Sequence, residues 1–202
     1  LEADFEVAKG DRLAVLGASG SGKSTLLSAI AGFLTLDRGR VIVDGVDVTR
    51  TPAPKRPLSI LFQEGNLFPH LTAFDNVALG LRTDLRLDEG TRARVHEALD
   101  RVGLAEMAAR RPGDLSGGQR SRVALARMLL RGKPLALLDE PFAGVDPISV
   151  NDIKSIIRHL KDRGIGVLIT DHNVRETLDI CERAYIVGEG HIIAEGTAQE
   201  VL

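Results

Sequence analysis

Apolar and polar residues alternate at the start of the chain, and short apolar runs follow at intervals. The alternation over residues 1–7 predicts a strand with one apolar face. The turn pair Asp44-Gly45 within residues 41–48 predicts a hairpin. Apolar runs bounded by turn residues predict buried strands at 13–16, 58–62, 135–138, 167–170 and 184–187.

Apolar residues at helical spacing predict helices between these strands, at 24–31, 148–161 and 174–181. From about residue 71 to 131 the helical spacing is continuous and no strand pattern interrupts it. The alternation of strand and helix elsewhere predicts parallel strands joined by right-handed crossovers. We therefore expect a single domain over residues 1–202, with a core built from 1–70 and 132–202 and a helical subdomain inserted at about 71–131.

Composition narrows the classes of function. The chain has 202 residues, 44% apolar and 27% charged, which is typical of a globular domain and not of a disordered one. A net charge of −2 and 3% aromatic residues argue against a nucleic-acid partner. The single cysteine, Cys181, excludes a disulfide framework and favours the cytosol. No apolar run approaches the roughly 20 residues that a spanning helix needs, so a role at a membrane requires a membrane-spanning partner.

A phosphate-binding loop follows the predicted strand at 13–16. The motif G-x-x-x-x-G-K-[ST] is formed by Gly17, Ala18, Ser19, Gly20, Ser21, Gly22, Lys23 and Ser24. Its glycines let successive backbone N–H groups point at phosphate oxygens, and the following helix adds its positive end. Lys23 is expected to reach the β- and γ-phosphates, and the Ser24 hydroxyl to bind Mg²⁺. The expected fold class is thus α/β: a P-loop NTPase parallel sheet with an antiparallel β edge and the inserted α-helical subdomain.

Acidic residues and a histidine stand just after two further strands. Asp139 and Glu140 end the apolar run at 135–138, and His172 comes after the run at 167–170. Because ligands of parallel sheets bind at the carboxyl ends of the strands, these side chains are expected in one crevice. Asp139 is expected to hold Mg²⁺, Glu140 to polarise the attacking water as a general base, and His172 to hydrogen-bond the γ-phosphate or that water. Two other histidines, His96 and His159, are expected at the surface.

A second glycine-rich helix start lies at Leu115-Ser116-Gly117-Gly118-Gln119. Ser116 is a plausible N-cap, and two glycines leave backbone N–H groups accessible to an anion. The residues alone leave two readings open. One is a capped surface helix, and the other is a two-fold dimer in which each chain's second site faces the nucleotide of its partner.

Together these motifs resemble the ATP-binding cassette ATPases, and the resemblance covers nearly the whole chain. It assigns nucleotide binding to the loop from Gly17 through Thr25, the Q-loop glutamine to Gln63 and the signature segment to Ser116–Gln119. It likewise assigns the D-loop aspartate to Asp146. Gln63 is thereby implied both as a catalytic residue and as a ligand of the metal. Asp139, Glu140 and His172 match the family's magnesium, general-base and switch positions.

The resemblance implies ATP and Mg²⁺ as cofactors and a head-to-tail homodimer that sandwiches two ATP molecules, with Ser116, Gly117, Gly118, Gln119 and Asp146 contacting nucleotide. It also implies transmembrane permease subunits as partners, which places the chain at the cytoplasmic face of the inner membrane. A soluble cassette protein acting on nucleic acid or ribosomes is the alternative from another class. The short, slightly acidic chain favours the transporter.

Finer resemblances differ between the two ends of the chain. The front resembles thiamine-importer ATPases, notably at residues 32–35 and 61–72, while the back, from about Phe142, resembles the lipopolysaccharide-export ATPase. We therefore expect either a chimera joined near residues 139–142 or ordinary divergence, with thiamine import favoured over lipopolysaccharide export. The family's adenine-stacking aromatic residue is expected before Leu1, so the chain is expected to be a truncated form.

Overall fold

The computed structural model describes residues 2–62, 66–198 and 200–201. Its main sheet has six strands in the order β4-β5-β6-β1-β7-β8. The first five are mutually parallel, and β8 runs antiparallel to β7 at the edge. The strands are β1 (Arg12–Leu16), β4 (Leu58–Leu61), β5 (Leu135–Asp139), β6 (Gly166–Asp171), β7 (Arg183–Gly188) and β8 (His191–Thr197).

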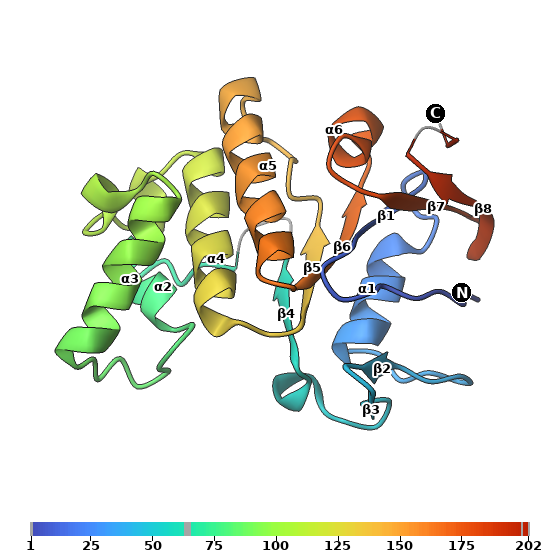
Figure 1. Cartoon of the computed structure of the whole chain (residues 1–202), viewed down its shortest axis with the longest axis horizontal. Coiled ribbons are helices and arrows are strands. Elements are labelled where there is room, and N and C mark those ends of the chain that lie inside the picture. Colours follow the sequence, from blue (N-terminus) through green and yellow to red (C-terminus); the bar gives the residue numbers. More distant parts are fainter. Residues whose placement is uncertain (1, 63–65, 199, 202) are drawn as a thin grey trace.

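Helices cover both faces of this sheet (Figure 1). Along β1, Leu13 and Val15 pack with α1 on one face, while Ala14 and Leu16 join the core formed with the other helices. Burial on both faces explains why the strands are apolar runs rather than alternating sequences. The helices are α1 (Lys23–Ala31), α2 (Ala73–Ala78), α3 (Glu89–Arg101), α4 (Gly117–Arg131), α5 (Pro147–Asp162) and α6 (Val174–Leu178).

The segment from 71 to 131 contains α2, α3 and α4 and no strand. Short 3₁₀ turns join these helices, η2 at Ala105–Met107 and η3 at Pro112–Asp114. Val95 and Leu99 of α3 are fully buried against the other two helices, as their helical spacing predicts. The three helices thus share one apolar core, which continues into the core between α5 and the sheet.

A buried arginine fixes the carboxyl end of α1, the helix that begins at the phosphate loop. Arg56 follows a 3₁₀ turn, η1 (Ala53–Lys55), and its Nη1 donates to the carbonyl oxygens of Ala29 and Ile30 at 2.9 and 2.6 Å. These carbonyls lie in the last turn of α1, where helices leave acceptors without intrahelical donors. Burial lowers the pKa of Arg56. The contact fastens α1 to the chain that leads into β4.

The predicted strands at 13–16, 58–62, 135–138, 167–170 and 184–187 are confirmed within one or two residues. The hairpin is also confirmed, as β2 (Ile42–Val43) and β3 (Val46–Asp47), although it forms a separate two-stranded sheet. The antiparallel edge of the main sheet is instead β8, which the apolar pattern did not reveal. All of its residues are exposed or half-buried, and its apolar run is limited to Ile192, Ile193 and Ala194.

Two predicted elements differ in the structure. The strand expected over residues 1–7 is wrong: in the described part, 2–7, only Glu2 forms a bridge, with its N–H donating to Gly190 O at 2.8 Å. A strand needs a neighbour with free backbone groups over several residues, and this segment meets the turn between β7 and β8. The helix expected at 174–181 ends at Leu178. Across the described ranges, no helix is long and apolar enough to cross a membrane.

Candidate active site

The register of the parallel strands brings the predicted site residues together at the carboxyl ends of neighbouring strands. In β1, Leu16 pairs with Asp171 of β6, and Asp139 of β5 pairs with Thr170. The residues that follow these strand ends are Gly17, Glu140 and His172. Because β1, β6 and β5 are adjacent and parallel, the loop, the carboxylates and the histidine emerge side by side.

The glycine-rich loop between β1 and α1 needs its glycines for two physical reasons. A Cβ at Gly17 would lie 2.2 Å from the carbonyl oxygen of Val187, so a larger residue would displace β7. Gly20 and Gly22 have φ angles of 79° and 105°, a left-handed region that favours glycine. The loop closes through Ser21 N–H donating to Ala18 O at 3.2 Å, and α1 then begins at Lys23. The positive end of α1 therefore points into the loop.

Lys23 lies inside this loop rather than in solvent. The residue is 7% exposed, and its Nζ donates to the carbonyl oxygens of Gly17 and Ala18 at 2.7 and 2.9 Å. Ser24 and Thr25, in the first turn of α1, are exposed, as are Ala18, Ser19 and Gly20 at the loop's tip. A buried ammonium surrounded by exposed backbone and hydroxyl groups is suited to bind a polyphosphate.

Asp139 and Glu140 are held by the end of β6. Thr170 Oγ1 donates to Asp139 Oδ1 at 2.6 Å, and Glu140 N–H donates to Thr170 O at 2.7 Å. Glu140 has a φ of 48°, which is uncommon for a residue with a side chain. This left-handed turn redirects the chain after the strand, and the Glu140 side chain keeps 24% of its surface exposed.

His172 stands between two carboxylates. Its Nδ1 lies 3.3 Å from Glu140 Oε2 and 3.6 Å from Asp171 Oδ1. The imidazole is 65% exposed, whereas Asp171 is fully buried. The structure thus brings together Glu140 and His172, whose proximity the sequence predicted only through sheet topology.

The second glycine-rich segment is the capped start of α4. Ser116 Oγ accepts from Gln119 N–H at 3.2 Å, and the Gln119 side chain accepts from Ser116 N–H at 2.9 Å, a reciprocal capping box. A Cβ at Gly118 would lie 2.4 Å from Ser149 Cβ, so glycine permits close contact with α5. The predicted N-cap role of Ser116 is confirmed.

Asp146 is the N-cap of α5. Its Oδ1 accepts from the N–H groups of Ile148 and Ser149 at 3.1 and 2.9 Å. The hydrogen bonds with Ser149 lower the pKa of Asp146, because they favour its charged form. Gly117 places α4 against the same segment, since a Cβ there would lie 3.0 Å from Gly144 O. Asp146 and the start of α4 therefore occupy neighbouring positions.

The predicted site residues fall into two groups within the chain. The first group lies at the carboxyl ends of the strands and consists of the loop, Asp139, Glu140 and His172. The second group lies at the adjoining starts of α4 and α5 and consists of Ser116–Gln119 and Asp146. In the described part of the chain, no hydrogen bond or ion pair joins the two groups. Gln63 lies outside the described residues.

Sequence reasoning assigned no role to Thr170 and Asp171, although both contact the predicted residues. Their signal was available, since both are polar residues at the end of an apolar strand and directly precede His172. The prediction that His96 and His159 lie at the surface is correct for His96, which is exposed and packs against the Phe74 ring at a tilt of 47°. His159 is instead half-buried, and its Nε2 lies 3.3 Å from Arg101 Nη1.

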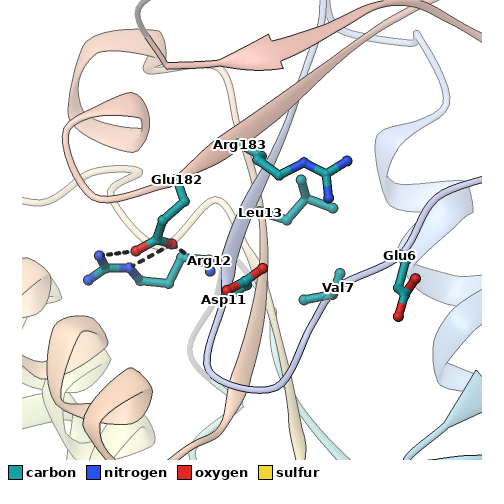
Figure 2. A pocket seen from close by; sticks show the side chains of 7 residues that line it. All are labelled: Glu6, Val7, Asp11, Arg12, Leu13, Glu182 and Arg183. Carbon is teal, nitrogen blue, oxygen red and sulfur yellow. Dashed lines mark hydrogen bonds and ion pairs between the residues drawn. The ribbon is translucent and has the colours of Figure 1, made fainter.

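A pocket of a different kind lies at the opposite end of β1 (Figure 2). There the carboxylate of Glu182 accepts from Arg12 Nη2 at 2.6 Å and from Lys161 Nζ at 2.5 Å. Burial by itself raises the pKa of Glu182, but the hydrogen bonds from Arg12 and Lys161 outweigh it and lower this pKa to about 2. The carboxylate of Glu182 is thus fully engaged by two cations of the chain itself, which indicates a structural role.

The comparisons with known proteins agree with this geometry. The ABC transporter family matches residues 2–143. The thiamine import ATP-binding protein ThiQ of Jannaschia sp. (strain CCS1) is 50% identical over 203 residues, covering 100% of this chain and 89% of the relative. The protein of the same name from Shigella flexneri is 44% identical over 197 residues, covering 97% and 85%.

Solved structures show the same fold. The dimeric cassette MJ0796, in a post-hydrolysis state bound to ADP and Pi, matches with a TM-score of 0.85 and 30% identity over 96% of this chain and 88% of that one. The cassette cbiO1 from Clostridium perfringens, part of the ABC transporter complex cbiONQ, matches with a TM-score of 0.86 and 31% identity over 98% and 81%.

The fold and the loop define a P-loop NTPase of the α/β class. More particularly, the chain belongs to the ABC transporter family, and it is the ATPase component of such a transporter. The alignment with thiamine import proteins runs through the whole chain, including the part from Phe142 onward. The expectations of a chimera and of a lipopolysaccharide-export relative therefore have no support.

Proposed function

We propose that the carboxyl ends of β1, β5 and β6 form the ATP site and that Glu140 acts as the general base in the hydrolysis of ATP. The contact between Glu140 Oε2 and His172 Nδ1 at 3.3 Å carries this proposal, because it sets a carboxylate and an imidazole next to the phosphate loop. Lys23 and the backbone from Gly17 to Thr25 bind the phosphates. Glu140 takes a proton from the attacking water, and His172 orients that water or the γ-phosphate.

Mg²⁺ fits the same site. Hydroxyl and carboxylate oxygens are the ligands that this ion prefers, and Ser24 and Asp139 offer one of each. Within the described ranges, no three His, Cys, Asp or Glu side chains gather closely enough to hold a metal by themselves. Ser24 and Asp139 would hold the ion, with Gln63 as a further ligand, and the ion would neutralise charge on the transferring phosphate.

Two chains are proposed to sandwich two ATP molecules head to tail. Within one chain the capped start of α4 and the phosphate loop form separate groups, so a second copy is needed to bring Ser116–Gln119 and Asp146 to the nucleotide. Two-fold symmetry makes both sites equivalent. The MJ0796 cassette, 30% identical, is described as dimeric. The helical subdomain at 71–131 is proposed to contact the membrane partner.

The transporter is proposed to import thiamine. The relatives of 50% and 44% identity that carry this function in their names cover at least 97% of this chain. The chain would then work at the cytoplasmic face of the cell membrane, bound to transmembrane permease subunits. Purification of the chain with its permease, followed by ATP-driven uptake of labelled thiamine into vesicles, tests this. Uptake of another solute in place of thiamine would contradict it.

Glu140→Gln tests the hydrolytic role. Glutamine keeps the size of the side chain but cannot accept the proton, so turnover should fall by roughly 10²–10⁴. ATP binding should persist because Lys23, Asp139 and the loop backbone are unchanged. Phosphate release and ATP titration measure the two effects.

The control for Glu140→Gln is Glu106→Gln, which changes an exposed glutamate in the turn η2. It should leave turnover unchanged. The assignment would be contradicted if Glu140→Gln, still folded by circular dichroism, hydrolysed ATP at more than about a tenth of the starting rate. A loss that small is less than general-base catalysis usually contributes.

A further inference from the structure

Asp171 is a fully buried carboxylate beside the proposed catalytic pair. It is the last residue of β6, and its exposed fraction is 0%. Its Oδ1 accepts from Asn173 N–H at 2.8 Å, and its Oδ2 accepts from Phe142 N–H at 3.4 Å. A buried carboxylate is costly unless hydrogen bonds or charges compensate it, so a residue of this type needs a specific reason.

The two backbone N–H groups that donate hydrogen bonds to Asp171 belong to two different loops. Phe142 lies two residues after Glu140, and Asn173 directly follows His172. One side chain therefore holds the loop that carries the carboxylate and the loop that carries the imidazole. His172 Nδ1 lies 3.6 Å from Asp171 Oδ1, the same oxygen that accepts the hydrogen bond from the Asn173 amide.

The Glu140 loop needs such a restraint. Glu140 has a φ of 48°, and strained backbone persists only when the surrounding structure fixes it. The restraints on this turn are Glu140 N–H to Thr170 O at 2.7 Å, Ala143 N–H to Glu140 O at 3.1 Å and Phe142 N–H to Asp171. Two of these three come from consecutive residues at the end of β6.

Asp171 also places negative charge next to His172 and Glu140. Burial raises the pKa of Asp171, the hydrogen bonds to the Asn173 and Phe142 amides lower it, and the charge of Glu140 raises it further. In the described part of the chain, the basic nitrogen within ion-pair distance of Asp171 is Nδ1 of His172, with no lysine or arginine beside it. The two backbone amides stabilise the carboxylate only in part, because the pKa of Asp171 is raised on balance and burial is the largest cause.

We propose that Asp171 is a positioning residue that fixes the separation of Glu140 and His172 by holding the Phe142 and Asn173 amides. It touches neither the reacting phosphate nor the water, and it acts through the two side chains on either side. This inference rests on the proposed hydrolytic role of Glu140 and adds to it the device that sets the geometry of the pair.

The first test compares Asp171→Asn and Asp171→Ala. Asparagine keeps one acceptor oxygen and loses the other, while alanine loses both. We expect turnover to fall about tenfold and about a hundredfold respectively, because a misplacement of about 1 Å can cost about 10²-fold. The KM for ATP should change less than about twofold, since the phosphate loop is untouched. If only the volume of the side chain mattered, Asp171→Asn would keep full turnover, because asparagine and aspartate have nearly the same volume.

The matched control is Leu178→Ala. Leu178 is buried in α6, close in sequence to Asp171, and its truncation removes apolar packing while leaving in place the acceptors of the Phe142 and Asn173 amides. If Asp171 merely stabilises the fold, Leu178→Ala and Asp171→Ala should reduce turnover equally at equal loss of stability. That outcome would overturn the proposal.

A double-mutant cycle with Glu140→Gln separates positioning from general stability. If Asp171 acts through Glu140, adding Asp171→Asn to Glu140→Gln should lower turnover further by less than about twofold. Independent effects would multiply instead. A full tenfold additional loss in the double variant would contradict the proposed route through Glu140.

Amide hydrogen exchange tests the inference without turnover. Asp171→Ala should speed exchange at the Phe142 and Asn173 amides, with that of Gly166 unchanged because its N–H donates to Pro134 O at the other end of β6. Unchanged exchange at Phe142 and Asn173 overturns the inference. Failure of the unsubstituted chain to hydrolyse ATP would instead overturn the proposed function, and the exchange result would still decide the role of Asp171.

Discussion

Lys23, the proposed phosphate-binding lysine, is held in place by its neighbours in the loop. Its ammonium is buried, and two carbonyl oxygens of the phosphate loop compensate its charge. Carbonyl oxygens offer the ammonium only a dipole, whereas phosphate oxygens carry negative charge and attract it more strongly. Exchange of these partners for phosphates would therefore favour binding of ATP.

Lys23→Ala should abolish tight ATP binding because it removes the cation nearest the loop. Titration calorimetry measures this directly. Lys55→Ala, which removes an exposed lysine from η1, is the control and should leave affinity unchanged. An affinity for Lys23→Ala within about twofold of the unsubstituted chain, less than about 0.5 kcal/mol, would exclude the assigned role.

At the scale of elements, ionic contacts join strands and a helix at the end of the sheet opposite the candidate active site. Glu182, at the start of β7, binds Arg12 of β1 (Figure 2). It also accepts a hydrogen bond from Lys161 of α5. Its neighbours hold its pKa at about 2 in place of the usual 4.5. A carboxyl whose pKa is lowered by folding stabilises the fold above its unfolded pKa, and this contribution is lost as the pH falls toward the folded pKa.

Glu182→Gln should therefore lower the free energy of unfolding at pH 7 and reduce the acid sensitivity of the fold. The unsubstituted chain loses this contribution between about pH 4.5 and pH 2, while the variant lacks it throughout. Urea denaturation at pH 7 and pH 3 measures the difference. Glu106→Gln, on an exposed turn, should leave both values unchanged. The role of Glu182 would be refuted if Glu182→Gln and Glu106→Gln lost the same free energy of unfolding as each other at pH 7 and at pH 3.

At the scale of the whole molecule, the arrangement of the two site groups supports the proposed dimer. The start of α4 and the N-cap of α5 lie together, while the phosphate loop lies at the end of β1. Figure 1 shows α1 and α4 on opposite sides of the sheet. One chain thus offers half of each proposed nucleotide sandwich.

Ser116→Arg should prevent ATP-dependent dimerisation while leaving ATP binding by the monomer intact, because a long cationic side chain would occupy the start of α4. Light scattering with ATP and Mg²⁺, in a Glu140→Gln background that slows hydrolysis, measures the dimer. Asp88→Arg is the control, since it adds the same side chain at the exposed N-cap of α3. Dimerisation of Ser116→Arg at the unsubstituted level would refute the sandwich.

The sequence by itself determined the local features of this protein. Residue spacing and turn chemistry predict the phosphate loop, the N-cap at Ser116, the helices from 71 to 131 and five core strands. Each of these depends on neighbours within a few positions, so an apolar run or a glycine motif predicts it directly. The proximity of Glu140 and His172 could also be predicted, since parallel strands place their carboxyl ends at one edge.

The tertiary structure alone decided the features that join distant segments. It placed β8 at the edge, left residues 2–7 without a strand, and brought Asp171 within reach of the Phe142 amide, 29 residues away. Likewise Glu182 meets Arg12 across 170 positions. No local pattern encodes such pairs, because they form only when strand order and register set which side chains face each other.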